Sequence, residues 1–180
     1  MKRNRTIEIL EKLCFYFFVC ALIGFIMESL YAFMLGNHEK RGFLYGPICP
    51  IYGFGAIILI ILDDLISKKT NSIIIKMIIM AIVFTIFEYL VSLVFELIFG
   101  IRWWDYSDAF LNLQGRICLE FSILWGIGGG AFIQFLYKPL QKLVDKVKNK
   151  VSYHVIDSIL IFLSIITLID FILSIVKYLK

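Results

Sequence analysis

Carboxylates inside long apolar stretches are the residues of this sequence best suited to chemistry. The candidate set for substrate or ion binding is Glu28, Glu88, Ser92, Glu96, Glu120 and Asp170. Ionisable groups within a bilayer are costly, so they face protein or water and commonly mark solute or ion pathways. The pattern predicts an acidic, outward-facing polar cavity that binds a cation, a cationic solute or a proton. Glu88, the deepest of the acids, is the principal candidate.

The spacing of these residues supports shared helix faces. Steps of three and four return to one face of a helix. Three stripes follow this rule: Thr85, Glu88, Ser92 and Glu96; Cys20, Gly24 and Glu28; Thr167, Asp170 and Ser174. A structural interpretation competes with binding. Glu28 and Glu120 could pair with Arg41, Arg102 or Arg116 and pin the loops, and Glu96 lies near enough to the boundary to reach water. We favour this alternative for Glu96 and Glu120 more than for Glu88.

The elements that must position these acids are long apolar segments. The chain of 180 residues is 61% hydrophobic and only 18% charged, whereas soluble domains are about a quarter charged. Five segments stand out, at residues 13–35, 48–66, 73–99, 117–137 and 155–177. About 20 apolar residues span a bilayer as a helix, and none of these segments alternates as a membrane strand would. The sequence predicts an all-α, polytopic bundle of about five transmembrane helices.

The basic residues predict the orientation. Twelve Lys and Arg lie on the side of the N-terminus and six on the other side. Because basic loops stay inside, we expect a cell-membrane protein with a cytoplasmic N-terminus and an external C-terminus. Segment 138–152 is amphipathic, with Lys142, Lys146 and Lys150 on one stripe. It is predicted to lie on the inner surface against anionic lipid, with docking of a partner as the alternative.

Two outer connections, 36–47 and 100–116, are rich in aromatic residues and glycine. The second is too long for a simple turn and carries Trp103, Trp104, Asp105 and Tyr106. We expect it to fold back as a short cap or re-entrant piece. Some of its rings also suit ordinary anchoring at the membrane interface.

A faint internal repeat links the two halves of the first 137 residues. Residues 46–49 read G-P-I-C and residues 115–118 read G-R-I-C, each followed by an aromatic residue and two spaced glycines. This pattern predicts a four-helix domain, 1–137, made of two hairpins, 13–66 and 73–137, followed by a fifth helix at 155–177. Repeat interfaces hold the sites of many transporters. Coincidence among a few small and aromatic residues is the alternative.

Small residues in these hairpins have packing and chemical interpretations. Glycines let membrane helices approach closely, and the candidates are Gly53, Gly55, Gly126 and Gly130. Flexibility for gating is the other interpretation. Cys49 and Cys118 occupy equivalent positions and could form a disulfide in an oxidising compartment, although packing as small apolar residues is favoured.

Several of these runs resemble a known family. They are E-S-L-Y at 28–31, R-G-F-L-Y-G-P-I-C-P-I-Y-G at 41–53, W-W-D-Y-S at 103–107 and N-L-Q-G-R-I-C at 112–118. They resemble the bacterial membrane family of ABC-transporter permease type IV (CmpB-type) proteins over about residues 13–137, with the fifth-helix region outside the resemblance. The resemblance implies a transport role and carries over no catalytic or binding residues.

The absence of several sequence motifs narrows the range of possible functions. The sequence has no phosphate-binding loop and no G-x-S-x-G or H-E-x-x-H, so it predicts no cofactor and no enzyme. ATP-driven transport would need a separate ATPase subunit. His38 and His154 are predicted at different depths and do not form a metal pair. The lysines cluster beside apolar runs, where lipid and topology explain them, so no nucleic-acid partner is expected.

Three functions remain in order of preference. The first is a membrane-embedded transport component that binds or moves a small solute or cation. The second is a membrane scaffold or regulatory protein that docks partners through its aromatic outer loops. The third is an intramembrane enzyme that uses Glu88 or Asp105 on a lipid-linked substrate. Because five short helices enclose little interior, we expect a homo-oligomer or a larger membrane complex in the bilayer.

Overall fold

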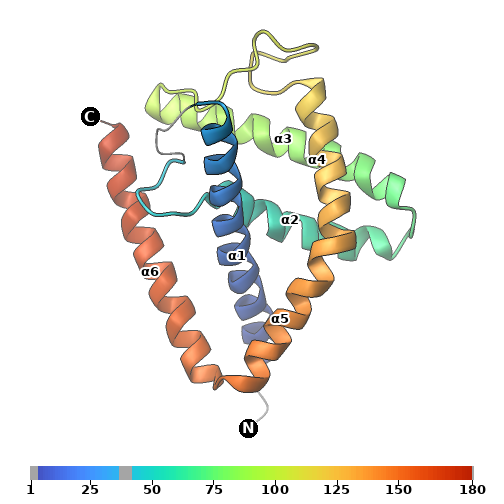
Figure 1. Cartoon of the computed structure of the whole chain (residues 1–180), viewed down its shortest axis with the longest axis vertical. Helices are drawn as coiled ribbons and strands as arrows, with labels where there is room; N and C mark the ends of the chain where they lie inside the picture. Colours follow the sequence, from blue (N-terminus) through green and yellow to red (C-terminus); the bar gives the residue numbers. More distant parts are fainter. Residues whose placement is uncertain (1–3, 37–41, 180) are drawn as a thin grey trace. The chain divides into compact units, whose positions relative to one another are not determined.

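The fold of the chain is helical in the part that the structure describes. The computed structural model describes residues 4–36 and 42–179. Its helices are α1 (Arg5–Met34), α2 (Pro50–Ser67), α3 (Ile73–Phe99), α4 (Leu119–Ala131), the π-helical turn η1 (Phe132–Leu136), α5 (Tyr137–Lys150) and α6 (Tyr153–Tyr178) (Figure 1). Within the described residues there is no strand, and one isolated bridge joins Leu113 to Ile117.

Five helical stretches of this described chain are long and apolar enough to cross a membrane. They are α1, α2, α3, the continuous stretch Leu119–Lys150 and α6. The prediction of an all-α, multi-pass membrane protein with five spanning helices is therefore confirmed at the level of length and composition.

The fourth spanning stretch continues further than the sequence suggested. We expected it to end at residue 137 and an amphipathic segment to begin at 138. Instead, α4 passes through η1 into α5 without a break (Figure 1). The amide of Tyr137 donates to the carbonyl of Phe132, five residues earlier, which is the bonding of a π-bulge. The helix therefore absorbs an extra residue where the sequence suggested a boundary.

The chain forms two compact units. The first comprises Met1–Ile58 and Pro139–Tyr178, and the second comprises Leu59–Lys138. In the first unit, α5 is tied to α1 by ion pairs from Lys148 to Glu11 (3.1 Å) and from Lys12 to Asp145 (3.9 Å). The predicted lipid contact of α5 and the two-hairpin repeat both stay predictions.

Helices α3 and α4 pack closely in the second unit because glycines face α3. A Cβ atom added to Gly126 would lie 2.7 Å from the carbonyl oxygen of Met77, and one on Gly130 would lie 2.6 Å from the Met77 Cγ. Such contacts leave no room for a side chain. In the first unit, a Cβ on Gly53 would lie 2.9 Å from the Phe17 carbonyl oxygen, while Gly55 is buried.

Candidate functional site

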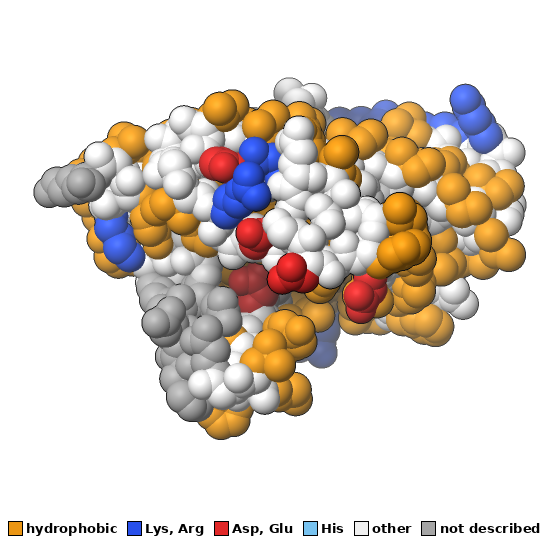
Figure 2. Space-filling model, turned by 90° about the horizontal axis from the view of Figure 1, so that it is seen from above, with side chains coloured by type: hydrophobic (Ala, Val, Ile, Leu, Met, Phe, Trp, Pro, Cys, Tyr) orange, Lys and Arg blue, Asp and Glu red, His pale blue; other side chains and the backbone are white. Residues whose placement is uncertain are grey.

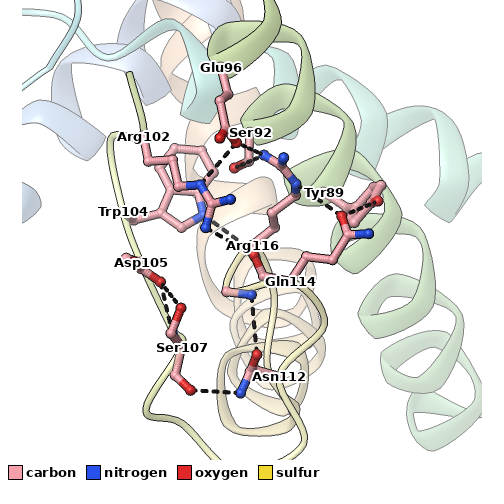
Figure 3. Close-up of polar contacts among 11 residues, drawn as sticks. Tyr89, Ser92, Glu96, Arg102, Trp104, Asp105, Ser107, Asn112, Gln114 and Arg116 are labelled. Atoms are coloured by element: carbon pink, nitrogen blue, oxygen red, sulfur yellow. Dashed lines mark hydrogen bonds and ion pairs between the residues drawn. The ribbon is translucent and has the colours of Figure 1, made fainter. Parts of the chain in front are cut away.

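The loop between α3 and α4, residues 100–118, is a folded cap held by its own hydrogen bonds. Gly100 ends α3 with a φ of 67°, a left-handed conformation that glycine adopts without strain. Farther along, the Asn112 amide donates to the carbonyls of Ser107 (2.9 Å) and Ala109 (3.0 Å) and accepts from the Gly115 amide (3.1 Å) (Figure 3). These bonds fix the shape of the loop itself.

Two charged groups of this loop have shifted pKa values. The Ser107 hydroxyl and amide donate to the Asp105 carboxylate, which lowers the pKa of Asp105. The hydrogen bond to Glu96 raises the pKa of Arg102. A depressed carboxyl pKa contributes stability above the unfolded-state pKa, and that contribution is lost as the pH falls through the folded-state pKa. Asp105 and Arg102 are therefore both charged at neutral pH.

Glu96 on α3 is neutralised by two arginines from this loop. Its carboxylate accepts from Arg102 Nε at 2.9 Å and pairs with Arg116 Nη1 at 2.5 Å (Figure 3). Arg116 is only 7% exposed and also donates to the Ser92 hydroxyl at 3.4 Å. Glu96 and Ser92 therefore pin the loop to α3. The arginine pairing suggested for Glu28 or Glu120 was wrong for Arg102 and Arg116, because a loop that folds back over α3 brings both arginines to Glu96.

Other loop residues complete this attachment. Trp104 Nε1 donates to the Arg116 carbonyl at 2.9 Å, and the Tyr89 hydroxyl donates to Gln114 Oε1 at 2.9 Å (Figure 3). Trp103 packs edge-on against Phe95 with ring centroids 4.9 Å apart. The aromatic residues predicted to form a cap therefore contact α3 or the loop itself.

Glu88 lies deeper on α3 in a different environment. It is 4% exposed. Its two oxygens accept from the Tyr106 hydroxyl (3.1 Å) and from Trp125 Nε1 on α4 (2.9 Å). The Trp125 ring stacks on Phe84 with centroids 5.6 Å apart, and the Tyr106 ring stacks on Phe121 at 4.6 Å. Among the described residues, no Lys, Arg or His forms an ion pair with Glu88.

The acids of the other unit hold the loop that precedes α2. Asp170 on α6 accepts from the amides of Tyr45 (2.8 Å) and Gly46 (2.7 Å) and from the Ser174 hydroxyl (3.3 Å). Glu28 on α1 accepts from the Cys49 thiol at 3.5 Å. Both carboxylates therefore contact the G-P-I-C run of residues 46–49.

The remaining candidates lie apart from these contacts. Glu120 is exposed in the first turn of α4, where the helix dipole favours an acid. His38 and Arg41 fall outside the described residues, and His154 at the start of α6 packs on Tyr153. All four cysteines are free thiols. Within the described chain, no group of three or more His, Cys, Asp or Glu could hold a metal.

Sequence reasoning singled out Glu88 as a candidate and did not predict the residues that surround it. Tyr106 was predicted as a cap residue, and Trp125 was noticed only as part of the repeat. Phe84 and Phe121 gave no signal, because an aromatic residue in an apolar helix is ordinary. Glu88, Ser92, Glu96 and Glu120 belong to one compact unit and Glu28 and Asp170 to the other. A cavity shared by all six stays a prediction.

These features define a class: a multi-pass helical membrane protein whose intramembrane carboxylates hold folded loops. The chain belongs to the family described as Putative ABC-transporter type IV, whose model matches residues 15–175. That range includes most of α6, which corrects our expectation that the fifth-helix region lies outside the resemblance. Neither a curated protein nor a solved structure matches the chain.

Proposed function

We propose that this ABC-transporter-related membrane protein is the membrane-embedded component of a transport system and that it binds a cationic solute at Glu88. The family description supports a transport role. The same description favours transport over the alternative of an intramembrane enzyme, in which Glu88 or Asp105 would act as the acid–base group. The location at the cell membrane, with the N-terminus in the cytoplasm, belongs to the same proposal.

The contrast between two carboxylates on α3 carries the proposal. Glu96 has two arginine partners. Glu88 lies two turns earlier and is more deeply buried, and among the described residues its donors are the neutral Tyr106 and Trp125. A buried charge needs a compensating charge, and intramembrane acids without one commonly lie on solute or ion pathways. A buried carboxyl group is compensated either by protonation or by a cation, and we propose that a cation compensates Glu88.

The α3–α4 loop that covers Glu88 supports access of the solute to this residue from outside the cell. The outer side is the one to which the distribution of Lys and Arg assigns this loop. Tyr106 reaches Glu88 from the loop rather than from a spanning helix. A rotation of this one side chain would free a carboxylate oxygen without breaking the arginine pairs at Glu96. The site is thus covered by a removable group and anchored by a separate set of contacts.

A change of Glu88 to glutamine tests this function. The amide keeps the size of the side chain and removes its charge, so retention of a cationic solute should fall by at least about tenfold. The measurement is mass spectrometry of small molecules released from protein purified out of its native membrane in mild detergent. Asp108→Asn, an exposed acid-to-amide change in the loop, is the matched control. Equal release of cationic molecules from wild type and Glu88→Gln would contradict the proposal.

The same purification addresses the partners. The proposed motor is a separate ATPase subunit, because the chain has no nucleotide-binding motif of its own. The proposed assembly is a homo-oligomer or a larger membrane complex. Intact mass in mild detergent reports both the copy number and any ATPase subunit.

One observation favours docking as a second candidate function. The tip of the α3–α4 loop exposes three apolar side chains: Phe110 by 76%, Leu111 by 66% and Leu113 by 53%. Leu111 has a φ of 51°, a left-handed conformation that costs energy for a residue with a Cβ and tends to occur at functional positions. Figure 2, a view from above relative to Figure 1, shows acidic and basic side chains as well as hydrophobic ones on the face that it presents.

The docking function predicts a different mutational result. The double change Phe110→Ser and Leu111→Ser removes apolar surface from the loop tip without touching Glu88. If the tip docks a partner subunit, the intact complex should lose that subunit at least partly, whereas Glu88→Gln should keep it. Native mass spectrometry compares the two variants. Retention of every subunit in the double variant would exclude the tip as the docking surface.

A further inference from the structure

The Glu88 site has features that specify its ligand more closely than a positive charge. We infer that the ligand is a monovalent organic ammonium ion with at least one N–H group, held by Glu88, Thr85 and the surrounding rings. This inference rests on the proposed function and names the class of its solute. Three observations on the described part of the chain carry it: a carboxylate that has no charged partner there, a buried hydroxyl that has no hydrogen bond there, and two stacked ring pairs.

The charge of the site fits a monovalent ion. When ionised, Glu88 contributes a single negative charge, and the other acid of the same helix face, Glu96, is already paired with two arginines. Divalent ions such as calcium take six to eight oxygen ligands. The described residues contain no cluster of three metal-ligating side chains. One carboxylate balances one positive charge.

The Thr85 hydroxyl supplies a second polar contact. Its oxygen is buried and has no hydrogen-bond partner among the described residues. Thr85 lies three residues before Glu88 on α3, so the two side chains share one face of the helix. Buried polar groups nearly always have a partner, and each exception calls for an explanation. An N–H group of a ligand bound at Glu88 would donate a hydrogen bond to the Thr85 hydroxyl oxygen and so give it the partner that it lacks among the described residues.

The rings favour an organic cation over a hydrated metal ion. Trp125 with Phe84, and Tyr106 with Phe121, form two stacked pairs with interplanar angles of 22° and 20°. One ring of each pair donates a hydrogen bond to Glu88. Their N–H and O–H groups lie in the ring planes, so these rings present polar edges to Glu88 and leave large apolar surfaces beside it, which suit an organic group better than a shell of water. An inorganic ion would instead need oxygen ligands, of which this site offers few.

Tyr106 occupies the place of a ligand donor. Its hydroxyl donates to Glu88 Oε1, the same oxygen that an ammonium N–H would use. Tyr106→Phe removes this competing donor and keeps the ring. The variant should therefore bind an ammonium ion about 2- to 10-fold more tightly, the effect of about one hydrogen bond.

The experiment titrates the purified full chain in lipid nanodiscs and follows its tryptophan fluorescence, because Trp125 contacts Glu88. The probes are ethylammonium, tetramethylammonium and sodium chlorides at constant ionic strength. Ethylammonium should bind saturably to wild type and to Asp108→Asn, and at least about tenfold more weakly to Glu88→Gln. Thr85→Val should weaken ethylammonium about 2- to 10-fold and leave tetramethylammonium, which has no N–H, unchanged.

The outcomes test the proposed class of ligand separately from the proposed cation-binding function. Glu88-dependent binding of sodium without binding of ethylammonium would overturn the ligand class and leave the cation-binding function standing. Equal loss of both ammonium probes in Thr85→Val would overturn the N–H contact. If no probe binds in a Glu88-dependent way, the ligand class is rejected, and the solute-release comparison then decides the proposed function on its own. Tyr106→Phe guards against misfolding, because a gain in affinity requires a folded site.

Discussion

Alanine at Gly126 is expected to destabilise the packed α3–α4 pair by about 1–3 kcal/mol. The added Cβ would lie 2.7 Å from the Met77 carbonyl oxygen and 3.0 Å from the Ala81 Cβ. The first of these atoms belongs to the backbone of α3, so the contact can be relieved only by moving a helix. Thermal unfolding of the purified protein in detergent, followed by circular dichroism, measures the loss.

Gly128 provides the matched control for this prediction. A Cβ at Gly128 meets no atom within 4 Å, and alanine is a better helix former than glycine by about 0.8–1.0 kcal/mol. Gly128→Ala should therefore leave the unfolding midpoint unchanged or raise it slightly. Equal destabilisation by the two changes would show that close packing against Met77 is not what requires a glycine at 126.

The change of Gly126 to alanine should also disturb the hydrogen bonds of Glu88. Trp125, the neighbour of Gly126, donates to Glu88 across the same helix pair. If α4 is pushed away from α3, this hydrogen bond lengthens and the tryptophan emission should shift toward longer wavelengths. The packing of the glycine face of α4 against α3 thus determines the geometry of the Trp125–Glu88 hydrogen bond beside it.

Leucine at Asp170 is expected to release the loop before α2. Asp170 accepts from the amides of Tyr45 and Gly46, and leucine accepts from neither. Both amides are at least partly exposed, so the loss is that of hydrogen bonds to a charged acceptor, about 1.5–3 kcal/mol, which corresponds to about a 10- to 150-fold change in an equilibrium. Opening of the loop should increase by this factor.

Labelling of Cys49 by a maleimide measures that opening. Cys49 is 3% exposed and begins the turn into α2, so its thiol reacts when the loop opens. The test uses a chain whose other cysteines are replaced by alanine. Asp170→Asn, which keeps one acceptor oxygen, should give an intermediate rate. Thr167→Val, one turn earlier on the same helix face, is the control. Labelling of Asp170→Leu at the control rate would show that this carboxylate does not hold the loop.

These contacts change how intramembrane acids should be interpreted in this chain. Glu28, Glu96 and Asp170 all contact loops, through a thiol, two arginines and two backbone amides respectively. The cost of a charge in lipid explains why such residues need partners, but it does not distinguish a loop anchor from a ligand site. Only the partners make that distinction.

The sequence by itself determined the class of fold and the position of its spans. Segment 73–99 was predicted with the same bounds as α3, because the length of an apolar run and the cost of unpaired backbone in lipid are local properties. The steps of three and four that placed Glu88, Ser92 and Glu96 on one face are equally local. Family membership followed from short runs that can be read without coordinates.

The tertiary structure decided which acid meets which partner. Arg102 and Arg116 lie 14 positions apart in a loop, and no periodic rule predicts that both reach Glu96. The continuation of α4 into α5 depended on a π-bulge, whose single extra residue leaves no compositional trace. Helix formation depends on neighbouring residues, whereas the pairing of charges depends on how a loop folds over two packed helices. Glu88 was therefore predictable as a candidate, whereas the absence of a charged partner for it among the described residues was not.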